Sequence, residues 1–435
     1  MGSATSDPGP TSGSAKDQGT TQAGHGQPLS GVRVLDLTRV LAGPFGTMIL
    51  GDLGADVIKV EEPRHGDGVR NIGPFYPGGL SHYFLAINRN KRSISVDMKS
   101  EAGRELILDL VEHSDVVIEN FRPGVMERLG LGFEQLVTRK PDVVLCSISG
   151  FGQSGPMAEK PSFDLVSQAL SGVMSITGEP DDPPTKMGLP MGDLGGGLWG
   201  SIAVLAALIR RERTGQPQHV DLSLLEGLIG LLGYLGQLAI LTGESPQRLG
   251  SDHHSVVPYG RFEVKDGHLV LALHVGGFWR GFCRAIGRED LIDDERFRTS
   301  GRRSENRAIL VPILQDILRQ KTRAQWQELL DAADVPHAPL LDVGEALVHE
   351  QIVSRNVLRD INHPTEGDVQ VVGPVVRFVG DAPQPLRPPP LLGEHSREIL
   401  ATLLGREDAA IDALIKSGVL GEPDEDIDSH EGTVS

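Results

Sequence analysis

One short glycine-rich run carries the side chain best suited to covalent chemistry. Asp193 lies in the run Gly-Asp-Leu-Gly-Gly-Gly at residues 192–197, directly before an apolar stretch, Leu198–Ile209, that predicts a helix. A carboxylate there faces several backbone N–H groups and the positive end of a helix dipole. Because glycines have no side chain, a bulky acyl group could approach the backbone closely. The position also suits an ordinary N-cap, so the local pattern leaves a nucleophile, a base and a structural cap open.

Composition narrows the classes of partner. The 435 residues carry 41 basic and 59 acidic side chains, a formal charge of −18, which argues against nucleic acid or an anionic membrane as a partner. The two cysteines, Cys146 and Cys283, cannot build a disulfide framework; we expect core residues in a reducing, cytoplasmic setting. No secretory signal is visible. The uncharged run Gly227–Gly243 is short for a membrane span and interrupted by glycines, so it predicts a buried helix.

The first 150 residues alternate between strand-like and helical patterns. The expected strands are 32–37, 56–60, 93–96, 115–119 and 142–148, and the expected helices are 45–53, 102–111 and 133–138. This alternation predicts a parallel sheet with right-handed crossovers. Arg39, Val40 and Ala42 follow the first strand, and ligands bind at the carboxyl edge of such a sheet. Core packing of Val40 and Ala42 is the alternative.

The pattern changes after residue 190. Long helices are expected at 194–213 and 222–242, with a strand-like run at 218–222 between them. An alternating run at 267–273 and helices at 277–286 and 311–319, with Pro312 in the first turn of the latter, follow a polar segment. We therefore expect a second, smaller domain between two parts of the first.

Seven runs along the chain are similar to those of a known family. They are Leu37–Pro44, Gly54–Glu61, Asn88–Ile94, Glu119–Gly124, Ser149–Pro156, the Asp193 loop and Pro390–His395. Each is weak alone, but their order is specific and they extend over nearly all of residues 29–404. The chain resembles the class III CoA-transferases, also called the CaiB/BaiF or formyl-CoA transferase family.

The resemblance implies an α/β fold with a Rossmann-like large domain formed by both chain ends, a smaller inserted α+β domain and an interlocked homodimer. The corresponding boundaries are 1–28 for a disordered tail, 29–225 for the first part of the large domain, 226–244 for a linker helix, 245–335 for the small domain, 336–420 for a return segment and 421–435 for an acidic tail.

The resemblance also implies a reaction. The family nucleophile falls on Asp193, which would form a mixed anhydride with the acyl group of an acyl-CoA and then an aspartyl-CoA thioester. Each tetrahedral oxyanion needs donors placed in advance, and we expect the N–H groups of Gly195, Gly196 and Gly197 to supply them. Coenzyme A enters as a substrate, and we expect no metal and no tightly bound cofactor.

Several cations and one aromatic side chain are expected beside CoA. Arg128 falls on a family CoA contact, although a surface charge is the alternative. Asn90, Lys91 and Arg92 form a basic turn near the expected CoA entrance, where a solvated turn is the other interpretation. Lys160 and Phe163 lie where phosphate and CoA contacts are expected. Their alternatives are a solvent-exposed lysine and a buried phenylalanine.

The sequence indicates the CoA donor and the acceptor acid less clearly than the reaction. Formyl-CoA transferases carry Gln where this chain has Leu41 and Glu where it has Asp164, so the oxalate and formate pair is not expected. The chain looks most like the branch that transfers CoA from succinyl-CoA to dicarboxylic acids such as glutarate. His253, His254 and Arg261 are candidates for the second carboxylate, with ordinary surface positions as the alternative.

Two other functions are possible for a chain of this scaffold. Racemases of 2-methylacyl-CoA esters resemble the same scaffold but need a His in a Gly-His-Asp run, where this chain has Ser162-Phe163-Asp164. Phe163 cannot move a proton, so two-base chemistry lacks one partner. A non-catalytic acyl-CoA-binding protein is the other alternative, and the intact Asp193 loop argues against it.

Overall fold

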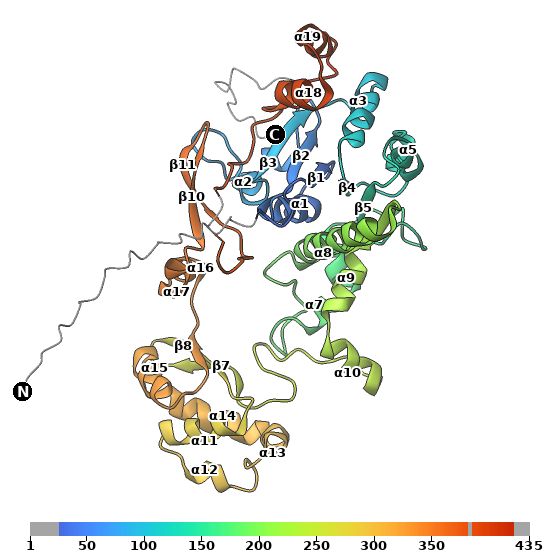
Figure 1. Cartoon of the computed structure of the whole chain (residues 1–435). Helices are drawn as coiled ribbons and strands as arrows, with labels where there is room; N and C mark the ends of the chain where they lie inside the picture. The colour runs from blue at the N-terminus through green and yellow to red at the C-terminus, as the bar shows by residue number, and fades with distance from the viewer. Residues whose placement is uncertain (1–25, 382–384, 422–435) are drawn as a thin grey trace, which may run out of the picture.

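The structure is a computed structural model that describes residues 26–381 and 385–421. Most of the predicted N-terminal tail, 1–25, and of the predicted acidic tail, 422–435, lies outside the described residues. Figure 1 shows a large lobe around a parallel sheet and a small lobe, residues 251–340, that stands apart from it.

The sheet of the large lobe has six strands in the order β3-β2-β1-β4-β5-β6, and every neighbouring pair is parallel. The strands are β1 Arg33–Asp36, β2 Asp56–Glu61, β3 Lys91–Ser95, β4 Val116–Glu119, β5 Val144–Ser149 and β6 Gln218–Ser223. The predicted parallel α/β sheet is confirmed. The chain leaves β1 toward β2 on one side and later returns to place β4 on its other side, so the strand order reverses between β1 and β4.

Helices cover both faces of the sheet, as is usual for parallel sheets. One face packs against α3 Glu101–Glu112, α5 Phe133–Arg139, α18 Ser396–Leu404 and α19 Asp408–Lys416. The other packs against α1 Ala42–Asp52, α8 Met191–Thr214 and α9 Leu224–Leu231. Helices from the two ends of the chain thus share one core.

Shorter elements complete this lobe. They are η1 Gly68–Asn71, α2 His82–Ile87, α4 Val125–Arg128, α6 Asp164–Leu170, α7 Val173–Ile176, α10 Tyr234–Thr242, α16 Val343–Leu347, α17 Glu350–Ser354 and the hairpin β10 Leu358–His363 and β11 Gly367–Val372. The single helix predicted over 222–242 is wrong, because Gly233 has a positive φ of 53° and the chain bends by 81° between α9 and α10.

The small lobe is α+β, with its own core and an antiparallel sheet in the order β7-β8-β9. Its elements are β7 Tyr259–Val264, β8 Gly267–Ala272, α11 Gly276–Ala285, α12 Asp290–Asp293, α13 Ser300–Glu305, α14 Arg307–Leu318, α15 Arg323–Ala332 and β9 His337–Pro339. The third strand lies beyond the predicted boundary at 335. Helix α14 begins at Arg307, so Pro312 is inside the helix and not in its first turn.

Among the described residues, α8 is the one unbroken helix long and apolar enough to cross a membrane. Half of its most apolar window is buried, and it packs along α1 and beneath β5 and β6. This burial is that of a core helix in a folded domain.

Candidate active site

A pocket of about 240 Å³ lies at the carboxyl edge of the sheet, where the strand order reverses between β1 and β4. It is lined by residues 39–42 after β1, 120–123 after β4, 148–150 at the end of β5, Ala158, Lys160, Ser162, Phe163, Asp193 and Leu224. Loops that leave neighbouring parallel strands in opposite directions open a crevice at this point, and open α/β sheets bind ligands there. The fold therefore places the Asp193 loop beside the segment after the first strand.

Asp193 is in the first turn of α8 and is not its cap. The helix begins at Met191, and the carboxylate of Asp164 accepts hydrogen bonds from Gly192 N at 2.7 Å and Asp193 N at 3.3 Å. Gln168 Nε2 in turn donates to Asp164 at 2.7 Å. Asp164, in α6, thus accepts from the free N–H groups at the start of α8. The Asp193 carboxylate has no hydrogen-bond partner among the described residues.

The surroundings of the Asp193 carboxyl raise its pKa toward neutral pH. Burial raises the pKa of Asp193 to about 7, and the negative charge of Asp164 adds to the increase. Burial, followed by the charge of Asp193, also raises the pKa of the Tyr83 phenol. Tyr83 does not line the pocket itself, and the sequence did not indicate it, because α2 carries no motif that links it to Asp193, 110 positions later.

The three glycines after Asp193 do not offer free N–H donors. Gly195, Gly196 and Gly197 are inside α8, beyond its first four residues, where each N–H group bonds to a carbonyl one turn back. Their role is close packing: a Cβ on Gly197 would lie 2.6 Å from Ala42 O. The prediction that these groups stabilise an oxyanion is therefore wrong, because α8 begins earlier than the sequence pattern indicated and includes the three glycines.

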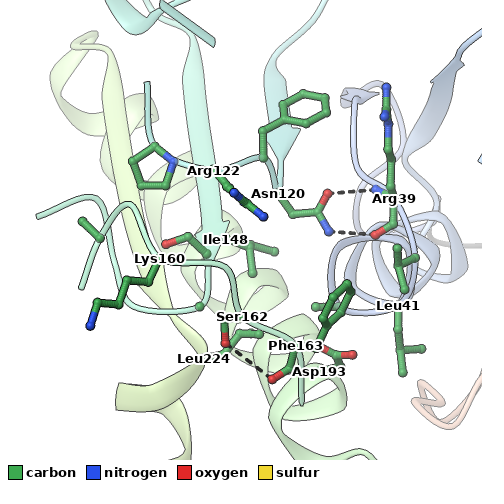
Figure 2. Close-up of a pocket in the computed structure, with 17 residues that line it drawn as sticks. Arg39, Leu41, Asn120, Arg122, Ile148, Lys160, Ser162, Phe163, Asp193 and Leu224 are labelled. Atoms are coloured by element: carbon green, nitrogen blue, oxygen red, sulfur yellow. Dashed lines mark hydrogen bonds between the residues drawn. The ribbon is translucent and has the colours of Figure 1, made fainter. Parts of the chain in front are cut away.

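The segment after β1 forms one wall of the pocket. Arg39, Val40 and Ala42 all line it, as does Leu41. Asn120, at the end of β4, accepts a hydrogen bond from Arg39 N at 2.8 Å and donates to Arg39 O at 2.7 Å, as Figure 2 shows. The core-packing alternative for Ala42 also holds, because that side chain is buried beneath the wall.

Lys160 and Phe163 lie on the opposite wall. Phe163 is 70% exposed and Lys160 is exposed, and both line the pocket (Figure 2). Arg122 joins them from the loop after β4. Its side chain points into the pocket, whereas the side chain of Lys160 points away from Asp193 (Figure 2). Arg122 was missed as a site residue, although it belongs to the Asn-Phe-Arg-Pro-Gly run that carries part of the resemblance.

The predicted basic turn at residues 90–92 is not part of this pocket. Lys91 is buried, with its Nζ 3.1 Å from Asp36, and burial lowers its pKa to about 8. Arg92 pairs with Asp56 and Glu398. The remaining member, Asn90, bonds to Asp52 and to Arg387 N. These side chains are fixed in structural contacts because β3 begins at Lys91, so a solvated turn does not describe them, and none of them lines the Asp193 pocket.

Arg128 is exposed on α4 and does not line the pocket. In the small lobe, His253 stacks on Tyr234, while His254 Nε2 lies 3.0 Å from Gln247 O. Arg261 pairs with Glu179 at 3.1 Å. Within one chain, none of these four predicted contacts faces Asp193.

The described residues contain no cluster of three His, Cys, Asp or Glu side chains arranged to hold a metal ion. Cys146 and Cys283 are both buried, and burial raises the pKa of each thiol to about 12. Both are core residues without thiolate character.

Comparison with known proteins gives matches over most of the chain. The sequence model of "CoA-transferase family III" matches residues 29–396. Succinyl-CoA:glutarate CoA-transferase of Mus musculus is 40% identical over 91% of this chain and 90% of its own length. Acetyl-CoA:oxalate CoA-transferase of Acetobacter aceti is 42% identical over 78% of this chain and 87% of its own length.

Solved structures show the same fold. A CAIB/BAIF family protein from Brucella suis superposes with a TM-score of 0.77 at 37% identity, covering 87% of this chain and 100% of its own. A Mycobacterium tuberculosis protein superposes with a TM-score of 0.77 at 32% identity, covering 86% and 99%. The chain belongs to CoA-transferase family III and is a CoA-transferring enzyme.

Proposed function

We propose that this enzyme moves CoA from succinyl-CoA to a dicarboxylic acid of the glutarate class, with Asp193 as the nucleophile. The observation that carries the proposal is an unpartnered, half-buried carboxylate at the pocket of a family III CoA-transferase. Relatives named for succinyl-CoA with glutarate or mesaconate support this choice of substrate.

The reaction exchanges CoA in four steps. The Asp193 carboxylate attacks the thioester carbonyl, the C–S bond breaks, and CoA leaves as a thiolate from a mixed anhydride. The thiolate attacks the aspartyl carbonyl, which releases succinate and forms an aspartyl-CoA thioester. The acceptor carboxylate then displaces CoA to form a second anhydride, and the thiolate attacks its acyl carbon, which frees Asp193. No proton is consumed overall.

The pocket supports this sequence in two ways. Leu41, Ile148, Phe163 and Leu224 give it apolar walls, which keep water from the anhydride and the thioester. A carboxylate that is not hydrogen-bonded is also a better nucleophile than one held by donors, since its lone pairs are free. The ring of Phe163 offers no group that could return a proton to an α-carbon, which disfavours racemisation.

Cations on the pocket walls suit the phosphates of CoA. Arg39, Arg122 and Lys160 come from three segments around the opening, and guanidinium and ammonium groups are the usual partners of phosphate oxygens. We propose that Arg128, on α4 just beyond Arg122, contacts the outer part of the same ligand.

A homodimer would complete the site. Large apolar side chains remain exposed on α8 to α10, among them Ile202, Ile229, Ile240 and Leu241. Exposed apolar surface of this extent is typical of an interface. We propose an interlocked dimer in which the partner's small lobe brings His253, His254 and Arg261 to the dicarboxylate, and a cytoplasmic location for the enzyme.

The decisive test is trapping of the covalent intermediate. Hydroxylamine added during turnover with succinyl-CoA and glutarate should convert Asp193 to a hydroxamate, found by mass spectrometry of the loop peptide. The Asp193→Asn and Asp193→Ala variants should lose turnover by about 10³-fold or more while remaining folded. Asp316→Asn, on the exposed face of α14, is the matched control. Near-normal turnover in either Asp193 variant would contradict the proposal.

A further inference from the structure

The backbone directly after β1 is held by side chains from three separate segments. Thr38 N donates to Asp36 at 3.0 Å, and Thr38 O accepts from Lys59 Nζ at 3.0 Å. The next residue, Arg39, is held at both its N–H and C=O groups by Asn120. This loop forms one wall of the pocket. Of the side chains that hold its backbone, Asn120 lines the pocket, whereas Asp36 and Lys59 do not.

Val40 is the strained point of this wall. Its φ is +67°, in the left-handed region that a β-branched residue rarely adopts. Val40 N lies 3.1 Å and 3.3 Å from the two carboxylate oxygens of Asp67, which therefore hold this conformation. Strain of this kind persists only where surrounding contacts determine the backbone, and it clusters at ligand sites.

Asp67 is itself locked in place. It is 2% exposed and lies 2.9 Å from the Nζ of Lys59, which is fully buried. Asp67 N donates to Glu61 at 3.0 Å, and Glu61 forms a second ion pair with Arg70. Neither Lys59 nor Asp67 lines the pocket, so neither is placed to touch the substrate. One buried pair thus holds two successive points of the wall, the carbonyl of Thr38 and the N–H of Val40.

We infer that the Lys59–Asp67 pair is a positioning device, which holds the left-handed turn at Val40 and thereby presents Arg39 to acyl-CoA. The inference rests on the proposed CoA-transferase function. Without the Asp67 acceptor, Val40 would relax toward a negative φ, and the peptide planes on both sides would turn. The Arg39 side chain would then leave its position over the ring of Phe121, 5.2 Å from the centroid.

The nucleophile should be less affected than the binding of acyl-CoA. Asp193 is fixed by α8 and its cap Asp164, neither of which bonds to Lys59 or Asp67. Losing the pair should therefore raise KM for acyl-CoA more than it lowers kcat. A purely structural role would instead lower stability and the amount of active enzyme without this split.

The experiment compares Asp67→Ala, Val40→Gly and the double variant. Glycine adopts positive φ without strain, so the turn no longer needs the carboxylate to hold it. We expect Asp67→Ala to raise KM for succinyl-CoA and the Kd for CoA about tenfold, with kcat within about threefold of the parent. The KM and Kd of the double variant should lie within about threefold of those of Val40→Gly alone, although the double variant lacks both the apolar contacts of Val40 and the buried carboxylate of Asp67.

A second variant guards against a folding failure. Asp67→Asn keeps an oxygen that can accept from Val40 N and removes only the charge opposite Lys59, so a smaller increase in KM is expected. Asp56→Ala breaks ion pairs at the other end of β2 and should lower thermal stability without changing KM. An unchanged KM in Asp67→Ala, or no recovery in the double variant, would overturn the inference.

Failure of the proposed function would look different. In that case the parent enzyme itself would not exchange CoA between succinate and glutarate. Calorimetry of CoA binding to the parent and to the Asp67 variants would then still test the positioning role without turnover. An active parent with insensitive Asp67 variants would contradict only the positioning role.

Discussion

The chemistry of Asp193 depends on a neighbour 29 positions earlier in the chain. The local sequence pattern fits either a nucleophile or an N-cap at Asp193, and in the structure the Asp164 carboxylate accepts from the backbone N–H groups at the start of α8 instead. The glycine-rich loop predicted a carboxylate at the start of a helix, because glycines and an apolar helix are local signals. It could not reveal Asp164, whose contact depends on how α6 packs against the start of α8.

A first prediction concerns the pH dependence of turnover. Because the pKa of Asp193 is raised to about 7, its carboxyl is protonated at acid pH and cannot attack. We expect kcat/KM to fall about tenfold per pH unit below the acid limb. Asp164→Asn removes a negative charge while keeping an acceptor for the helix start, so this limb should move to lower pH. An unmoved limb would show that another group controls the acid side.

A second prediction concerns stability. The pKa of Asp193 is raised on folding, so the protonated carboxyl stabilises the folded state at acid pH, and this contribution is lost as the pH rises through 7. At pH 8 the free energy of unfolding of Asp193→Asn should therefore exceed that of the parent by about 1–2 kcal/mol, after allowance for partial exposure, and the variant should unfold at a higher denaturant concentration. At pH 4 the difference should be small. Equal stabilities at both pH values would contradict the raised pKa.

At the scale of elements, the sequence predicted the sheet better than the helices after it. Strands β1, β2, β4 and β5 are largely apolar runs bounded by helical patterns, and the expected positions of β1 to β5 lie within two residues of those observed. The start of α8 was placed too late because glycines are poor helix formers in isolation. Packing against α1 overrides that propensity, since only glycine lets the two backbones approach.

A third prediction follows from this close approach. A Cβ on Gly197 would lie 2.6 Å from Ala42 O and 3.0 Å from Gly46 N, both backbone atoms that cannot move alone. Gly197→Ala should destabilise the protein by about 1–3 kcal/mol and lower turnover, because α1 follows the pocket wall at residues 39–42 and α8 carries Asp193. Gly301→Ala, in α13 with no atom within 4 Å of the added Cβ, should be neutral or slightly stabilising. Chemical denaturation of both variants provides the comparison.

At the scale of the whole molecule, composition marked the small lobe but not its exact end. Strand β9 has three residues and pairs with β8 more than sixty positions earlier, so no local pattern distinguishes it from a loop. The hairpin β10–β11 was likewise absent from the prediction. Its valines at 369 and 371 pack against Val69 and Phe84, contacts set by the return of the chain to the large lobe.

The final prediction tests whether two chains share each site. Co-expression of an Asp193→Ala chain with a His253→Ala/Arg261→Ala chain, each with its own tag, yields heterodimers purified on both tags. If the partner's small lobe completes the pocket, one of the two sites in the heterodimer combines an intact Asp193 with an intact small lobe. Turnover should then reach about half that of the parent dimer, far above either variant homodimer. If each chain builds its site alone, every site carries a defect and turnover stays at the level of the homodimers.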